Sequence, residues 1–230
     1  INGAFLGGVK KLLFLGSSCI YPKNAKQPIG EKELLDGKLE LTNEPYSIAK
    51  IAGIKMCESY NRQYAKKYKI DYRSIMPTNL YGPGDNYHTK NSHVIAGLIN
   101  RFHYAKLKNK KTVKVWGDGS PYREFLFVDD MAQASIFIMN INKKIYESYV
   151  TSRCSHINVG SGLEISIEQL SKLIKEVVGF KGKITFDKKK SNGTRRKLLN
   201  SQIIRNLGWT PKVTLKKGLV LTYKDFLKLC

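Results

Sequence analysis

Residues 11–17 read Lys-Leu-Leu-Phe-Leu-Gly-Ser, an apolar run that ends in a glycine and a hydroxyl group. A short continuous apolar run bounded by a turn residue predicts a buried strand of a parallel sheet. The carboxyl ends of such strands are where open α/β sheets bind their ligands. Ser17, at the end of this run, is therefore the first candidate for a functional side chain.

A Tyr-x-x-x-Lys spacing follows in residues 45–50, which read Pro-Tyr-Ser-Ile-Ala-Lys and begin a helix expected to continue to about residue 68. Four residues make about one helical turn, so Tyr46 and Lys50 share one helix face. An ammonium held beside a tyrosine favours the phenolate, and such a tyrosine can exchange a proton with a carbonyl oxygen near neutral pH. The spacing alone also fits two solvated side chains, and Ser17 at a strand end favours the catalytic interpretation.

Expected strands and helices alternate along the chain, which indicates an α/β fold with a parallel sheet covered by helices. The further strands are expected at 72–76, 112–116, 124–128, 155–159 and 183–186, and the helices at 94–104, 129–141, 167–178, 201–207 and 215–229. A doubly wound nucleotide-binding sheet normally has a G-x-G-x-x-G loop after its first strand, and the sequence contains none. We therefore expect a partial doubly wound sheet from a longer enzyme, with its first half missing.

The net charge of +22 is compatible with an anionic partner such as nucleic acid. The lysines are scattered and aromatic residues do not interleave them, which favours a solvated surface and no nucleic-acid partner. No apolar run is long enough to span a bilayer, and we expect a cytoplasmic protein without a membrane partner. No metal site is expected either, because no zinc-like spacing joins the four cysteines, Cys19, Cys57, Cys154 and Cys230.

Several runs resemble the GDP-L-fucose synthase family of the extended short-chain dehydrogenase/reductases, and they occur in that family's order. These runs are Phe-Leu-Gly-Ser-Ser-Cys-Ile-Tyr-Pro at 14–22, Asn-Glu-Pro-Tyr through Lys at 43–50, Pro-Thr-Asn-Leu-Tyr-Gly-Pro at 77–83, Asn-Ser-His-Val-Ile at 91–95, Arg-Glu-Phe-Leu at 123–126 before Val-Asp-Asp at 128–130, and Arg-Lys-Leu-Leu at 196–199. The runs around Cys19 and His93 are specific, because generic sugar-nucleotide epimerases usually lack both. Phe127 departs from the family, which commonly has a histidine there.

The resemblance implies a partial Rossmann-type NAD(P)-binding domain at residues 1–81 and 127–159. It also implies a smaller α/β substrate-binding domain at residues 82–126 and 160–230. The implied reaction epimerises GDP-4-keto-6-deoxy-D-mannose at C3 and C5 and then reduces it at C4 with NADPH, giving GDP-L-fucose and NADP. The family is usually homodimeric, with the Tyr46 helix at the interface.

The resemblance also implies catalytic roles. The Cys19 thiolate would remove the C3 and C5 protons, and His93 would return protons on the opposite face of the sugar. Ser17 and Tyr46 would bind the C4 oxygen, and Lys50 would hold the nicotinamide ribose. If the chain stays extended beyond Ser17, the side chains of Ser17 and Cys19 point to the same side. By residue type alone, Cys19 fits a small buried residue and His93 a surface histidine.

Further positions follow from the same resemblance. Arg123 and Lys197 would neutralise the GDP diphosphate, and Arg101 and Trp116 would contact the nucleotide. Arg101 and Trp116 fit a solvated helix residue and a core aromatic equally well. The residues beside the cofactor would be Ser17, Tyr46, Lys50, Pro77, Thr78, Asn79, Leu80 and His93.

Three other functions remain open at this point. The first is another extended short-chain sugar-nucleotide epimerase or dehydratase, against which Cys19 and His93 argue, because a pure C4 epimerase needs no second acid and base. The second is a nucleic-acid-binding module, which steeply salt-dependent DNA binding would favour. The third is a fragment that binds a GDP-sugar without catalysis.

Overall fold

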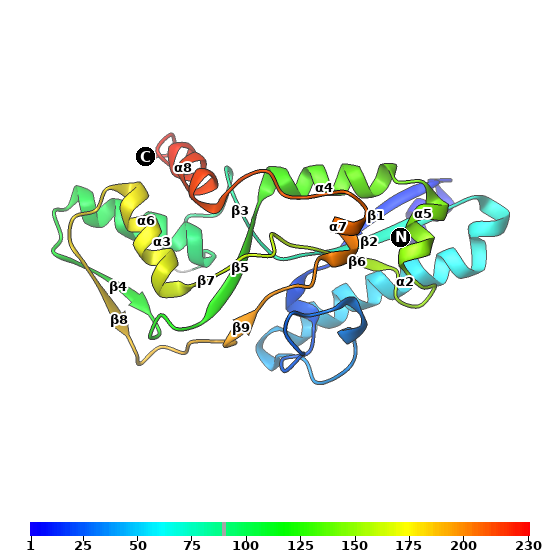
Figure 1. Ribbon diagram of the computed structural model, residues 1–230, viewed down its shortest axis with the longest axis horizontal. Helices are drawn as coiled ribbons and strands as arrows, with labels where there is room; N and C mark the ends of the chain where they lie inside the picture. The colour runs from blue at the N-terminus through cyan, green and yellow to red at the C-terminus, as the bar shows by residue number, and fades with distance from the viewer. Residues whose placement is uncertain (89–90) are drawn as a thin grey trace. The chain divides into compact units, whose positions relative to one another are not determined.

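The computed structural model describes residues 1–88 and 91–230, and it divides the chain into two compact units (Figure 1). The first unit comprises Ile1–Thr78, Met131–Gly162 and Leu198–Thr210, and the second comprises Asn79–Asp130, Leu163–Lys197 and Pro211–Cys230. In the described part of the chain, no helix combines the length and apolar character needed to cross a bilayer.

The first unit is built on a parallel sheet in the order β1-β2-β6, which confirms the expected α/β fold. The strands are β1 (Lys11–Leu15), β2 (Asp71–Pro77) and β6 (His156–Val159). Leu15 pairs with Ile75 and Pro77 pairs with Val159, so all three strands end at the same edge of the sheet. This edge is where sequence analysis expects the functional side chains.

Helix α2 (Glu44–Tyr68) packs against β1 and β2 (Figure 1). Pro45 lies in its first turn, where the missing N–H costs no hydrogen bond. The helix ends at Lys69, whose φ of 57° is left-handed and whose N–H donates to Ala65 O. Gly53 faces the sheet so closely that a Cβ atom there would lie 2.1 Å from the Phe14 ring. A glycine is therefore needed where the helix crosses the strand.

Short elements complete the first unit. The buried side chain of Arg73 links the sheet to two of the helices. Its guanidinium pairs with Asp71, donates to Ile138 O and lies 4.4 Å from the centroid of the Tyr146 ring. The elements are α1 (Asn2–Leu6), α5 (Lys143–Tyr149), α7 (Gln202–Asn206), the 3₁₀ helices η1 (Ser18–Ile20), η2 (Glu31–Glu33) and η3 (Leu41–Asn43), and most of α4 (Val128–Asn140).

The second unit has one mixed sheet and one strand pair. Strand β5 (Tyr122–Phe127) pairs in parallel with β3 (Asn79–Tyr81) and β9 (Arg196–Lys197), and antiparallel with β7 (Glu164–Ser166). The parallel pair is β4 (Thr112–Trp116) with β8 (Lys183–Asp187).

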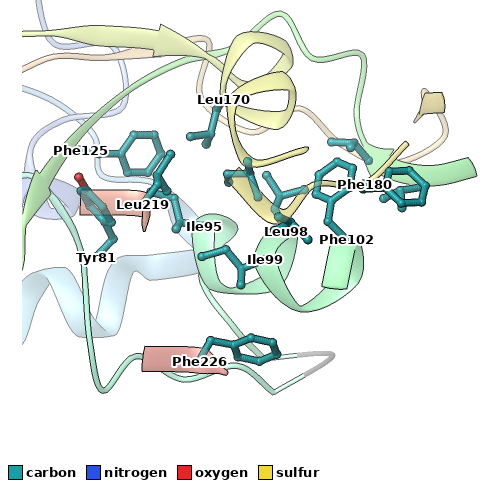
Figure 2. Packing of buried hydrophobic residues seen from close by; sticks show 14 of the residues in the cluster. Tyr81, Ile95, Leu98, Ile99, Phe102, Phe125, Leu170, Phe180, Leu219 and Phe226 are labelled. Atoms are coloured by element: carbon teal, nitrogen blue, oxygen red, sulfur yellow. The ribbon is translucent and has the colours of Figure 1, made fainter. Parts of the chain in front are cut away.

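The core of the second unit lies between its helices and β5. The helices are α3 (Val94–Leu107), α6 (Ile167–Val178) and α8 (Leu215–Phe226). Figure 2 shows their apolar side chains pointing toward one another, with Phe102 of α3 beside Phe180 at a ring-centroid distance of 5.6 Å. Helix α6 begins with a reciprocal capping box between Ser166 and Gln169, which accounts for the sharp start expected at residue 167.

Residues 198–210 belong to the first unit, whereas sequence analysis groups residues 160–230 together. A bridge between Ile29 and Leu199, and hydrogen bonds from Asn158 to Ile29 O and Asn200 O, attach this segment to the first unit. These contacts join residues that are far apart in sequence, and no local sequence pattern predicts them.

The contact at Gly53 is open to a stability test. We expect Gly53→Ala to lower the free energy of unfolding by about 1–2 kcal/mol, because overpacking against Phe14 outweighs the better helix propensity of alanine. Urea unfolding measures the change. Gly3→Ala is the matched control, since a Cβ at Gly3 meets nothing within 4 Å. A Gly53→Ala protein as stable as Gly3→Ala would contradict the proposed role of this contact.

Candidate active site

Ser17 lies at the carboxyl end of β1 and caps the turn that follows. Its backbone is extended, with φ −164° and ψ 141°, and its Oγ accepts a hydrogen bond from Cys19 N at 3.2 Å. The chain then turns into η1, so the expectation that it stays extended through Cys19 is wrong. The physical reason is the serine cap, which stabilises the start of a helical turn. Both side chains are half-buried.

Lys50 joins helix α2 to the end of β1. Its Nζ donates to Leu15 O at 2.9 Å and lies 5.8 Å from the centroid of the Tyr46 ring. Tyr46 is 44% exposed, which leaves its phenol open to a ligand. The structure thus brings Lys50 and Tyr46 to the strand end that carries Ser17.

A second set of contacts ties η1 to the first turn of α2. The carbonyl of Cys19 accepts hydrogen bonds from Ser47 Oγ at 3.4 Å and from Asn43 Nδ2 at 3.5 Å. Ser47 is fully buried, and its single hydroxyl proton is shared between Cys19 O and the closer Asn43 O at 2.9 Å. Sequence analysis misses both residues, although Ser47 lies inside the Tyr-x-x-x-Lys run. Their contacts fix the backbone of Cys19 relative to the helix that carries Tyr46.

The neighbouring strand contributes Pro77 and Thr78. Both are buried, and Thr78 N donates to Val159 O at 3.0 Å, which continues the β2–β6 ladder past the end of β2. These two predicted cofactor positions therefore share the sheet edge with Ser17.

A buried polar network lies behind η1. Tyr21 O–H donates to Asn158 Oδ1 at 2.6 Å, and the hydroxyl oxygen of Tyr21 also lies 3.1 Å from His156 Nε2. Burial, reinforced by the charge of Lys55, lowers the pKa of His156 to about 4. Burial also raises the pKa of Tyr21 well above its usual value, with a further contribution from Glu31. This network could not be predicted from the sequence, because Tyr21 is more than 130 residues from His156 and Asn158.

A cavity of about 260 Å³ lies at the opposite end of the same sheet. Asp71 begins β2 and Ser155 precedes β6, so the cavity lies near the amino ends of the strands. Several of its polar groups are already bonded within the protein, such as Glu58, which accepts from Lys55 and from Ser155 N. The cavity is therefore distinct from the edge that carries Ser17.

The second unit carries His93 at the start of α3. The residue is exposed, occupies the N-cap position and makes no side-chain capping hydrogen bond, which leaves its imidazole open to a ligand. Burial raises the pKa of Asp85, an effect opposed by the backbone N–H of Asn86 and by the charge of His93.

Two expected diphosphate ligands are neighbours in the second unit. Arg123 of β5 and Lys197 of β9 are paired residues of adjacent parallel strands. Arg123 also donates to Tyr122 O at 2.8 Å and to Asn192 O at 3.5 Å. Two cations at one register position suit an anionic group that spans both.

A second cationic feature surrounds Trp116. Arg101 Cζ lies 5.0 Å from the Trp116 ring, and Lys190 Nζ lies 5.7 Å from it. Trp116 is 54% exposed, so it is not a core aromatic. Burial lowers the pKa of the Arg101 guanidinium, which donates to Lys114 O. Sequence analysis misses Lys190, which lies in an unremarkable lysine run.

The two remaining predicted cofactor residues, Asn79 and Leu80, lie on β3. Asn79 Nδ2 donates to Glu124 O at 2.8 Å, so its amide is partly used by the sheet. Within the described ranges, no group of three or more His, Cys, Asp and Glu side chains could hold a metal ion.

Comparison with known proteins gives consistent matches. The sequence profile of the NAD dependent epimerase/dehydratase family matches residues 2–160. The GDP-L-fucose synthase of Escherichia coli (strain K12) is 56% identical over 228 residues, which cover 99% of this chain and 70% of that protein. The putative GDP-L-fucose synthase 2 of Arabidopsis thaliana is 56% identical over 99% of this chain and 66% of its own length. The chain thus spans about two thirds of the length of these relatives.

A solved structure is similar over the same extent. A GDP-L-fucose synthetase from Naegleria fowleri bound to NADP superposes with a TM-score of 0.88 at 27% identity, covering 99% of this chain and 69% of that one.

The buried histidine predicts a pH dependence of stability. With a pKa of about 4 when folded and 6.5 when unfolded, His156 binds fewer protons in the folded state between these values. Its contribution, about 3 kcal/mol, is complete above pH 6.5 and is lost as the pH falls toward 4. Urea unfolding across this range should show a steeper rise with pH for the wild type than for His156→Gln. If the free energy of unfolding rose equally with pH in the two proteins, the lowered pKa of His156 would be contradicted.

Proposed function

Because the chain belongs to the NAD dependent epimerase/dehydratase family, we propose that it carries out the reaction of GDP-L-fucose synthase. In this reaction GDP-4-keto-6-deoxy-D-mannose is epimerised at C3 and C5 and then reduced at C4 to GDP-L-fucose. The observation that carries the proposal is the 56% identity to the Escherichia coli enzyme over 228 residues. The runs that contain Ser17, Cys19, Tyr46 and His93 lie within that extent.

The ketone at C4 makes the epimerisation possible, because it acidifies the hydrogens on C3 and C5. In the proposed mechanism the Cys19 thiolate removes these protons, and His93 supplies protons to the opposite face of the sugar. The contacts of Ser47 and Asn43 with Cys19 O support this role for Cys19, because they hold its backbone in one position.

Ser17 and Tyr46 bind the C4 oxygen in this proposal. Ser17 Oγ already accepts a hydrogen bond from Cys19 N, so its own proton is available for donation to the ketone. Tyr46 donates a second hydrogen bond, which stabilises the enolate, and transfers its proton when C4 is reduced. Lys50 holds its ammonium group 5.8 Å from the centroid of the Tyr46 ring, on the same side of the helix.

The donor set at the edge of the first sheet fits NADPH, which supplies the hydride for C4 when bound. Lys50 has three donors and uses one on Leu15 O, which leaves two for the ribose hydroxyls. Pro77 and Thr78, at the end of β2, would line the nicotinamide. We assign Asn79, Leu80 and His93 of the second unit to the same cofactor.

The GDP portion of the substrate is assigned to the second unit. Arg123 and Lys197 would neutralise the diphosphate, and their pairing on adjacent strands supports this assignment. Trp116 and Arg101 would contact the nucleotide, and the exposed indole face of Trp116 supports this assignment.

A homodimer through α2 and a cytoplasmic location complete the proposal. Ile48, Ala52 and Met56 are exposed on one face of α2 at four-residue spacing, which supports contact with a second copy of the chain. A reducing compartment suits a reaction that needs Cys19 as a thiol.

The reaction can be tested by isotope exchange and NADPH oxidation in the same samples. We expect Cys19→Ser to lower deuterium incorporation from D₂O at C3 and C5 by about 10²–10⁴-fold, while some direct C4 reduction remains. Tyr46→Phe should abolish NADPH oxidation. The matched control is Cys154→Ser, another half-buried cysteine. Equal exchange in wild type and Cys19→Ser would reject the assignment of the base, and GDP-sugar binding without turnover would favour a binding fragment.

The dimer has its own test. We expect Met56→Glu to shift the protein toward a monomer in sedimentation velocity, because a carboxylate would be buried in the contact without a partner. Ile145→Glu is the control, since Ile145 of α5 is an exposed isoleucine away from α2. The same sedimentation coefficient for both variants and the wild type would exclude this interface.

A further inference from the structure

Tyr21, two residues after Cys19, has a buried side chain with two polar partners. Tyr21 is 3% exposed and follows the single turn of η1 directly. Its hydroxyl contacts both Asn158 and His156 of β6. A phenylalanine would fill the same space, so packing alone does not explain a buried hydroxyl with two polar partners.

The orientation of the Asn158 amide follows from its own partners. Its Nδ2 donates to Ile29 O at 2.9 Å and to Asn200 O at 3.2 Å. Two carbonyl groups on this side require the NH₂ group, so Oδ1 must face Tyr21 and accept its proton. The backbone N–H of Asn158 donates to Glu31 Oε1 at 3.0 Å. Asn158 therefore fixes Tyr21 relative to two other segments of the first unit, residues 29–31 and Asn200.

The tautomer of His156 follows in turn. Tyr21 has one proton and gives it to Asn158, so the contact of 3.1 Å requires His156 Nε2 to donate to the tyrosine oxygen. The other ring nitrogen, Nδ1, is buried and has no hydrogen-bond partner. Leaving a buried acceptor unsatisfied has a cost, which the hydrogen bond from Nε2 to Tyr21 partly offsets.

We propose that Tyr21, His156 and Asn158 are positioning residues that hold the Cys19 thiol in the orientation needed for proton abstraction. The turn of η1 is fixed at its start by Ser17 Oγ on Cys19 N, and at Cys19 O by α2. The anchored Tyr21 ring fixes its other end. The inference rests on the proposed function only in giving Cys19 the role of base.

The direct test measures the reactivity of Cys19 without turnover. In Tyr21→Phe we expect iodoacetamide to label Cys19 about fivefold faster than in the wild type, because η1 opens locally once the hydroxyl bonds are lost. Peptide mass spectrometry resolves the four thiols, and exposed Cys230 of the second unit serves as an internal reference that should not change, whereas Cys154 lies close enough to the network to respond. Unchanged labelling of Cys19, or equal acceleration at Cys19 and Cys230, would overturn the proposal.

Two further variants separate positioning from general stability. Tyr146→Phe also removes a buried tyrosine hydroxyl, one that donates to Ser155 O, and it should leave Cys19 labelling at the wild-type rate. His156→Gln retains a donor for Tyr21 and should behave as the wild type, whereas His156→Leu should behave as Tyr21→Phe. Acceleration of Cys19 labelling in Tyr146→Phe would contradict the proposal.

The catalytic consequence is read in the isotope experiment. In Tyr21→Phe, exchange at C3 and C5 should fall about tenfold relative to C4 reduction, because a misplaced base slows only the steps that use it. A parallel loss of both steps would overturn the positioning role. If Cys19→Ser leaves exchange unchanged, the proposed function fails, but the labelling comparison still decides whether the network positions the thiol.

Discussion

The close contact between α2 and β1 is the constraint on which the first unit depends. Gly53 allows the helix to lie directly on the Phe14 ring, and Lys50, less than one turn earlier, reaches the carbonyl of Leu15. These contacts lie along one face of the helix. The distance between Gly53 and the sheet therefore also determines the position of the Lys50 ammonium group. The contact that packs the helix on the sheet therefore also places the polar groups at the sheet edge.

The two units contribute different chemistry. The ends of parallel strands and the start of a helix bring hydroxyl, phenol, ammonium and thiol groups to one sheet edge of the first unit, and the proposed function assigns most of the proton transfer to these groups. The second unit carries cations, with Arg123 and Lys197 paired across β5 and β9 and two cations around Trp116. This distribution suits a substrate that is neutral at the reacting sugar and anionic at its nucleotide.

Buried polar groups in the first unit serve orientation more than stability. The side-chain polar groups of Tyr21, His156 and Asn158 are bonded to one another or to the carbonyl groups of Ile29 and Asn200, and the exception is His156 Nδ1. Such a network adds little net stability over an apolar core, but it permits only one arrangement of its members. In the proposed mechanism a single arrangement matters next to Cys19, because proton abstraction would depend on the direction of its thiol.

The sequence by itself determined the α/β class and most helix and strand positions, and it supplied the candidate reactive side chains, because these depend on local periodicity and on short motifs. Strand β4 and helix α6 begin and end where expected, since alternation and a capping box are local signals. The contacts of the Cys19 carbonyl with the start of α2, the anchoring of Tyr21 and the place of residues 198–210 in the first unit were decided only by the tertiary structure. Each depends on hydrogen bonds or packing between segments distant along the chain, and no local pattern encodes which segments will meet.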